Sequence, residues 1–301
     1  MTLLNDPASF PSPMWIVARY LAVNPGRPHS RDSLRAVLAP GSLLPVNKRG
    51  TDSTFDSAVR SLEDLGVVRV EADDVSLSEI GASLRPDDFA TFSDLLRRQV
   101  LEPTRNAAIA DSGDQSGPKD LVRALSWFLT LDPLVTMSHD DVVQRQRGAL
   151  AEHLGNPFVN DVRWIRFTYW ASALGLAAPP LLPPAGRAQT LVPDCAAAVF
   201  RTVRAKWPPG TRLAAREAVA GIVDELPVLP GGRYSLALGL PNEAADVSAT
   251  LSFALLCGDE YGWLKLDRRS DADDEVLLVD PDRSNRTLRI THVEVQEAAD
   301  G

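Results

Sequence analysis

Apolar residues at helical spacing predict a helix that ends at residue 65 and a hairpin directly after it. The apolar stripe of this helix consists of Phe55, Ala58, Val59, Leu62 and Leu65. Residues three and four apart share one helix face, so this spacing is typical of a buried side. Gly66 stands where a C-cap glycine belongs. Two short strands, at 67–71 and 75–79, are then expected around the turn 72–74.

Two more helices are predicted before this segment. The first covers residues 13–23, and the second covers 31–38, for which Ser30 is a suitable N-cap. Thr51 or Asp52 is expected to cap the helix that follows. Three helices and then two short strands give the element order of a winged helix-turn-helix module.

A similar succession is predicted in the middle of the chain. Pro118 suits the first turn of a helix, Ser138 caps a second over 140–154, and Asn160 caps a third. The prolines of 179–184 cannot form a regular interior ladder, because proline lacks the backbone donor. A wing in this module is therefore expected to be irregular.

The last part of the chain repeats the pattern with longer connections. Helices are predicted at 196–206 and 213–226, and a third over 247–257, capped by Asp246 and stopped at Gly258. The following segments predict a hairpin of 263–268 with 275–280 and one more strand at 288–295.

The predicted fold class is mainly α with small β-hairpins (α+β), arranged as tandem winged helix-turn-helix modules. Module 1 covers residues 1–103 and includes an extra amphipathic helix at 87–101. The polar stretch 104–117 is expected to be a linker. Module 2 covers 118–192 and module 3 covers 193–301, which is either a winged helix or a small α+β domain.

Composition is that of a globular protein, with 45% apolar and 24% charged residues. No apolar run approaches the roughly 20 residues of a membrane span, and the first residues lack a signal-peptide pattern. The two cysteines, Cys195 and Cys257, are expected to be reduced, buried thiols. We therefore expect a cytoplasmic protein without membrane contact.

The net charge of −9 argues against nonspecific nucleic-acid binding by the chain as a whole, since such binding depends on cations that replace counterions at phosphates. The charge is uneven, however. Residues 193–301 carry 12 Lys and Arg against 18 Asp and Glu, so most of the acidic excess is C-terminal. Any nucleic-acid surface is expected in the first two thirds.

The predicted third helix of module 2 is the stronger candidate for nucleic-acid contact. Arg163, Arg166 and Trp170 are spaced to share one helix face. Two guanidiniums beside an indole suit a phosphate backbone or an unstacked base, and Arg145 and Arg147 could extend the patch. In the alternative interpretation, the aromatic residues of this helix are core and the arginines extend over them.

Module 1 offers a second candidate interface along its third helix, which would enter the major groove in a DNA-binding winged helix. Its candidate residues are Lys48, Arg49, Thr54, Ser57 and Arg60. Hydroxyls can contact base edges and cations can hold phosphates. Asp56 and Asp64 oppose this, so the alternative is a solvated helix or a protein contact.

Module 3 has no basic helix face, and its hairpin turn at 271–275 is acidic. A protein partner or a homodimer contact fits this module better than DNA. Four scattered histidines and two cysteines give no metal spacing, and no phosphate loop or nucleophile elbow occurs. We expect no catalytic residues, no metal and no cofactor.

Three segments resemble proteins of the DpdG type: Leu3-Leu4-Asn5, residues 13–17 and residues 54–62. The likeness covers the first 85 residues, and the remainder shares the predicted architecture. Such proteins belong to bacterial gene islands for deazaguanine DNA modification and associated restriction. The resemblance implies an accessory, non-catalytic component that works beside helicases and nucleases, and it assigns no catalytic residues.

Three hypotheses for function follow from these observations. The leading one is a non-catalytic DNA-binding or adaptor protein of a bacterial DNA modification and defence system, with DNA and other proteins of that complex as partners. The second is a protein–protein scaffold that never contacts nucleic acid. The third is a winged-helix transcription regulator, which would need an operator and usually a dimer.

Overall fold

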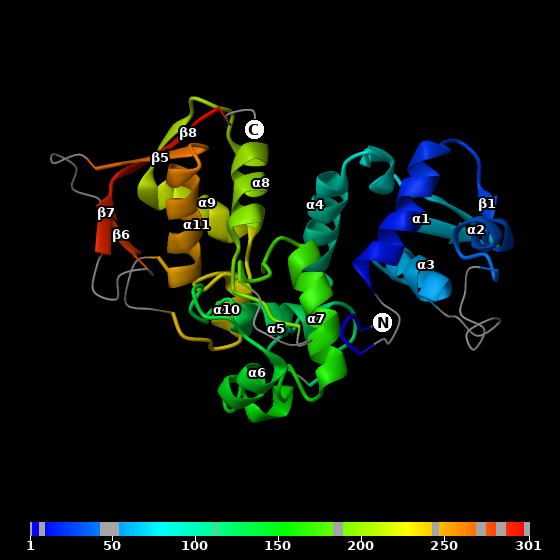
Figure 1. The fold of residues 1–301 in the computed structure, drawn as a ribbon, viewed down its shortest axis with the longest axis horizontal. Coiled ribbons are helices and arrows are strands. Elements are labelled where there is room, and N and C mark those ends of the chain that lie inside the picture. Colours follow the sequence, from blue (N-terminus) through cyan, green and yellow to red (C-terminus); the bar gives the residue numbers. More distant parts are fainter. Residues whose placement is uncertain are drawn as a thin grey trace. The chain divides into compact units, whose positions relative to one another are not determined.

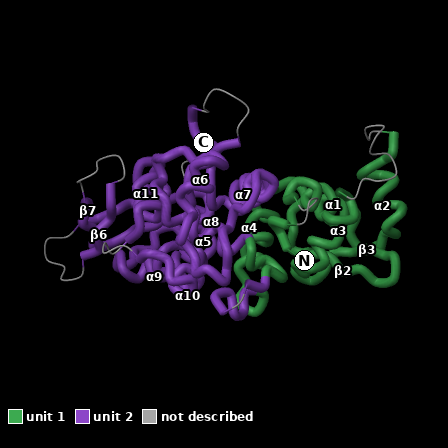
Figure 2. Tube along the Cα trace, turned by 90° about the horizontal axis from the view of Figure 1, so that it is seen from below, with its two compact units in different colours: residues 1–105, 115–120 green, residues 106–114, 121–301 purple. Residues whose placement is uncertain are grey.

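The structure is a computed structural model, and the residues it describes are 2–5, 10–42, 54–111, 113–182, 189–242, 247–268, 275–280 and 287–297. The chain divides into two compact units (Figure 2). Unit 1 comprises residues 1–105 and 115–120, and unit 2 comprises 106–114 and 121–301.

The described residues form a mixed α/β protein of helices and small antiparallel sheets (Figure 1). The helices are α1 (Pro11–Val23), α2 (Arg31–Leu38), α3 (Thr54–Asp64), α4 (Phe89–Val100), α5 (Lys119–Phe128), α6 (His139–Arg145), α7 (Asp161–Ala173), α8 (Ala196–Lys206), α9 (Ala215–Glu225), α10 (Arg233–Ala237) and α11 (Ala249–Glu260). The strands are β1 (His29–Ser30), β2 (Val68–Glu71), β3 (Asp74–Leu77), β4 (Arg212–Ala214), β5 (Leu264–Asp267), β6 (Val276–Val279), β7 (Thr287–Ile290) and β8 (His292–Val295).

Module 1 has the element order that its sequence predicts, with one additional strand. The two-residue strand β1 lies between α1 and α2 and pairs with β3, so the sheet has the order β1-β3-β2. Ser30 caps α2 as expected, because its side chain accepts a hydrogen bond from the Ser33 backbone. The cap positions Thr51 and Asp52 lie outside the described residues.

Modules 2 and 3 repeat this strand order. In module 3 the sheet order is β4-β8-β5, so the strand between the first two helices again pairs with the last strand. In module 2 the strands are reduced to isolated bridges, Met137 with Leu191 and Ala178 with Val192. Where an irregular wing is predicted, the described residues form these two single bridges.

Glycine ends α3, α7 and α11 in the same way. Gly66, Gly175 and Gly262 have φ angles of +74°, +73° and +71°. Each donates its N–H to the carbonyl three residues back, and the next residue donates to the carbonyl five residues back. This Schellman pattern requires a left-handed residue, for which glycine has no Cβ penalty.

Two of the glycine stops were predicted, and the third was placed wrongly. Gly258 lies inside α11, where a Cβ would stand 2.9 Å from atoms of Trp263 and Leu264. It is therefore a close-packing position, and the helix continues to Glu260. Ser248 caps α11, and the predicted cap Asp246 lies outside the described residues.

The predicted hairpin of 263–268 with 275–280 is wrong. Strand β5 pairs with β8, while β6 pairs with β7 in a separate two-stranded sheet. The predicted strand 288–295 is divided at Thr291, whose N–H donates to the Asp267 carbonyl. Pairing β5 with β8 brings the buried side chains of Leu264, Val293 and Val295 together.

The helix predicted over 140–154 ends at Arg145. The Gln146 side chain donates to the Phe158 carbonyl at 2.7 Å and accepts from the Phe158 N–H at 2.8 Å. Gly148 then has a φ angle of +71°. These two features turn the chain, so that only Glu152–Leu154 is helical again, as a short 3-10 turn.

Part of the predicted linker is packed against unit 2. Within residues 106–114, Asn106 and Ile109 are almost fully buried. The Arg123 guanidinium donates to the Ile109 carbonyl at 2.7 and 2.9 Å and to the Asp114 carbonyl at 2.9 Å. In unit 1, Asp120 accepts hydrogen bonds from the backbone of Leu3 and Leu4.

Candidate nucleic-acid interface

The arginines predicted to face nucleic acid from α7 are buried. Arg163 and Arg166 are each 5% exposed, and Trp170 is fully buried. Arg163 Nη1 donates to the Pro157 carbonyl at 3.0 Å. The prediction that these residues share an exposed basic face is therefore wrong, because this side of α7 is turned inward among aromatic residues.

The aromatic residues around α7 form the core of module 2. The rings of Phe158 and Phe167 lie 4.9 Å apart, and those of Phe128 and Phe167 lie 5.1 Å apart, both edge to face. The Trp164 indole also donates a hydrogen bond to the Gln189 carbonyl at 2.9 Å. Such contacts add to the energy of burial. The alternative interpretation of core aromatics is thus correct for Trp164, Phe167 and Trp170 but wrong for Tyr169, which is exposed.

The outward side of α7 is apolar. Val162, Ile165 and Tyr169 are 44%, 37% and 45% exposed, at helical spacing. All residues of α7 are described. Its cationic residues are the two buried arginines, Arg163 and Arg166. The exposed face of this helix is therefore better suited to contact with another protein than to contact with a phosphate backbone.

The candidate residues of module 1 are only partly accessible. On α3, Arg60 is exposed and Thr54 is half-buried, but Ser57 is 5% exposed and cannot reach a base edge. Lys48 and Arg49 lie outside the described residues.

Asp56 on α3 holds two arginines of α2. Its Oδ1 accepts from Arg31 Nε at 3.1 Å and from Arg35 Nη2 at 2.5 Å. The Arg35 guanidinium also lies over the Phe55 ring, 5.4 Å from its centroid. Sequence reasoning counted Asp56 only as a repulsive charge and did not single out Arg31 and Arg35. Their spacing of four residues on one helix was the available signal.

Arg145 and Arg147 are both exposed, at and just beyond the end of α6. Arg145 helps to lower the pKa of Asp141, after the larger effect of the hydrogen bonds from Ser138. These two arginines and Arg60 are the candidate residues that remain exposed cations in the described part of the chain.

Helix α11 of module 3 is covered by its own chain. Thr250, Leu251, Ser252, Ala254 and Leu255 on α11 are buried. Strand β6 lies against this helix, and the Val279 N–H donates to Ser252 Oγ at 3.0 Å. The face of α11 that these residues form is therefore not available to a DNA groove.

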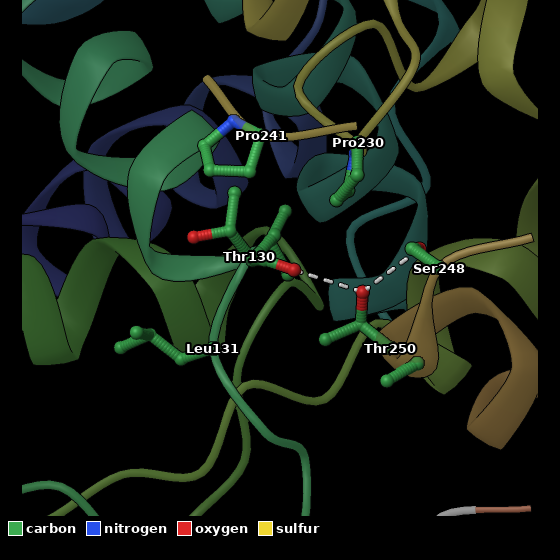
Figure 3. Close-up of a pocket in the computed structure, with 8 residues that line it drawn as sticks. Thr130, Leu131, Pro230, Pro241, Ser248 and Thr250 are labelled. Carbon is green, nitrogen blue, oxygen red and sulfur yellow. Dashed lines mark hydrogen bonds between the residues drawn. The ribbon is translucent and has the colours of Figure 1, made fainter. Parts of the chain in front are cut away.

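A small cavity of about 70 Å³ lies at the N-terminal end of α11 (Figure 3). Thr250 Oγ1 donates to the Leu129 carbonyl at 2.9 Å and lies 3.3 Å from Ser248 Oγ. Pro230 and Pro241 close the other side. Because a water occupies about 30 Å³ in the liquid, this space suits waters and not a nucleobase.

Cys195 and Cys257 are free thiols in module 3. Cys195 is buried, and its Sγ lies 3.5 Å from the Thr250 carbonyl. Burial raises the pKa of the Cys257 thiol to about 11, and it raises the pKa of Cys195 further. Both are therefore protonated at neutral pH, which makes them poor nucleophiles.

Within the described ranges, no cluster of three or more His, Cys, Asp or Glu side chains could hold a metal ion. Among the helices formed by the same residues, none combines the length and apolarity that a membrane crossing requires.

The fold described above defines a mixed α/β protein of helices and small antiparallel sheets. The chain belongs to the DpdG-like family, whose model matches residues 1–272. The match thus extends through modules 1 and 2 and into module 3. No curated protein and no solved structure matches the chain.

Proposed function

We propose that the three modules are tandem winged helices. The repeated strand order supports this assignment, since the strand before the second helix pairs with the last strand in each module. The glycine stop after each third helix supports it further. In module 3, the strands β6 and β7 are then an insertion within the wing.

The function that these surfaces support best is that of a non-catalytic adaptor in a deazaguanine DNA modification system. Membership of the DpdG-like family suggests the association with such a system. The adaptor role is carried by one observation, the outward face of α7. Where a DNA-binding winged helix needs polar and cationic residues, this helix exposes Val162, Ile165 and Tyr169.

The adaptor role is tested by co-purification of the chain with the other proteins of its modification system, with and without nuclease treatment. We expect the association to survive removal of DNA and to be lost in Ile165→Asp, which places a charge at the centre of the apolar face. Leu236→Asp is the matched control, because Leu236 is an exposed apolar residue elsewhere in unit 2. Loss of the association on nuclease treatment would argue against the adaptor role.

DNA contact is a second candidate function, and the exposure of Arg60, Arg145 and Arg147 favours it. Gel-shift titrations on mixed duplex and single-stranded DNA at two ionic strengths test it. Contact through phosphates predicts affinity that falls with salt, by a slope of about −0.9 per phosphate for duplex DNA. The absence of any shift at low salt would exclude this function.

A further inference from the structure

Module 1 contains a cleft of about 390 Å³ that the proposed adaptor role does not use. It lies between the end of α1, the loop of residues 24–28 and the hairpin β2–β3, with residues 82–84 on the remaining side. Pockets for small molecules begin at about 300 Å³, and apolar walls with a few polar groups are typical of them. The cleft meets both conditions.

Two guanidinium groups line this cleft. Arg27 is exposed and makes no hydrogen bond or ion pair with any residue that the structure describes. Among the described residues, Arg69 forms one ion pair, with Glu71. The distance between Arg69 Nη1 and Glu71 Oε1 is 3.4 Å. Both side chains of this pair are more than half exposed, which makes the ion pair weak. Both arginines are therefore available to an anion.

Apart from Asn24, Glu71 and Ser76, the remaining lining of the cleft carries no polar side chain. Leu21 and Leu84 are 3% and 7% exposed, so they form its floor, while Pro25 and Pro28 stand in the loop above. Proline rings and aliphatic side chains pack well on the face of a planar ring. Ser76, which pairs with Arg69 across the hairpin, adds a hydroxyl.

We propose that this cleft binds a small phosphate-bearing ring compound of nucleotide size. Arg27 and Arg69 contact the phosphate, because a guanidinium fits phosphate oxygens with two parallel hydrogen bonds. The ring lies on the floor of Leu21 and Leu84. Glu71 accepts from a ring N–H, as carboxylates do from base edges. Two guanidinium groups alone would bind inorganic phosphate. The apolar floor provides a contact surface for a ring in addition.

The proposal is tested by calorimetric titration of the full chain with GMP, AMP, guanosine and inorganic phosphate. We expect saturable binding of at least one nucleotide, and binding of the nucleoside and of phosphate that is at least about tenfold weaker. Charge-assisted hydrogen bonds contribute enough for a factor of this size. No saturable binding of either nucleotide, or binding of phosphate as tight as that of the nucleotides, would overturn the proposal.

Variants then locate the site. Arg27→Ala and Arg69→Ala should each raise the dissociation constant about tenfold, and Ala82→Trp should abolish binding by filling the cleft. Arg98→Ala is the matched control, since Arg98 is an exposed arginine of unit 1 outside the cleft and should leave binding unchanged. Nucleotide binding that none of the first three variants weakens would place the site elsewhere and refute the assignment.

Discussion

Asp56 decides how much positive charge module 1 presents. It is the common partner of Arg31 and Arg35, which are 31% and 43% exposed. These are the two arginines of α2, the helix that precedes α3. A phosphate would have to compete with a carboxylate that already occupies both guanidiniums. In this way one acidic residue of α3 offsets the two positive charges that α2 would otherwise present.

We predict that Asp56→Asn increases affinity for duplex DNA. Asparagine keeps the shape of the side chain and removes its charge, so Arg31 and Arg35 become free to contact phosphates. The magnitude of the salt slope should rise by about one to two, for one or two added phosphate contacts. Gel shifts at two ionic strengths measure this change. Glu63→Gln, which removes an exposed acid of the same helix, is the control, and equal effects of both variants would contradict the model.

Asp194 gives a residue-scale prediction about pH. Its Oδ1 accepts the Ala196 N–H at 2.8 Å, and burial raises the pKa of this carboxyl. Because the pKa is higher in the folded state, the unfolded chain loses this proton at a lower pH than the folded chain does. The negative charge on Asp194 therefore lowers the free energy of unfolding at pH values above the unfolded-state pKa. Asp194→Asn should therefore be more stable than the natural chain at pH 7. The difference should vanish near pH 3, which denaturant titration at both values can show.

Which face of α7 is buried could not be predicted from its sequence. Apolar or aromatic residues occur at positions 162, 164, 165, 167, 169 and 170, so they surround the helix instead of forming one stripe. Periodicity then gives no direction. The choice is made by Phe128 and Phe158, which come from outside the helix and pack on Trp164 and Phe167. Local spacing contains no such information.

At the scale of elements, local sequence signals were sufficient to predict a helix end wherever a capping residue or a C-terminal glycine determines that end. Ser30 and Asn160 cap α2 and α7 as predicted, and Gly66 and Gly175 follow the third helices. Strand partners, in contrast, are chosen by long-range burial. Strand β5 could pair with either of two apolar segments, and the structure pairs it with β8. The strand-forming residues are alike in both segments, so sequence alone favoured the nearer one.

The glycine stop of module 2 provides a test at this scale. Gly175 has a φ angle of +73°, and a Cβ added there would meet the Arg201 side chain and lie 3.1 Å from the Ala198 nitrogen. The Gly175 carbonyl also accepts the Ala198 N–H at 3.1 Å, which joins α7 to α8. Gly175→Ala should lower stability by more than the left-handed strain alone, which is about 1 kcal/mol.

Gly148→Ala is the matched control for this prediction. Its φ angle of +71° is nearly the same, but nothing lies within 4 Å of the added Cβ. It should show the strain without the steric contact, so the difference between the two variants measures the packing of α7 against α8. Chemical denaturation followed by tryptophan fluorescence gives both values. Equal losses in the two variants would show that the contact carries no energy.

At the scale of the whole molecule, α3, α7 and α11 all end at a left-handed glycine but differ in what they present to their surroundings. Helix α3 carries paired charges, α7 exposes apolar residues, and α11 is covered by β6. Several helix ends could be predicted because caps and stops recur along the chain. The surfaces could not, because they depend on which neighbours cover each helix. Repetition of a helix stop therefore does not imply repetition of a binding site.

Variants of the arginines in module 2 distinguish residues that stabilise the fold from residues that contact DNA. Arg163→Ala removes a buried hydrogen bond to the Pro157 carbonyl, and an unsatisfied buried group costs about 1–3 kcal/mol. This variant should therefore melt at a lower temperature than the natural chain, while Arg145→Ala and Arg147→Ala, whose side chains are exposed, should melt unchanged. In gel shifts the effects should be the opposite: Arg145→Ala and Arg147→Ala should weaken DNA binding, and Arg163→Ala should not. Of these three side chains, only Arg145 and Arg147 are exposed and can contact phosphates. If Arg163→Ala weakened DNA binding without changing the melting temperature, α7 would have to turn its arginines outward on DNA, and its assignment as a protein-binding helix would fail.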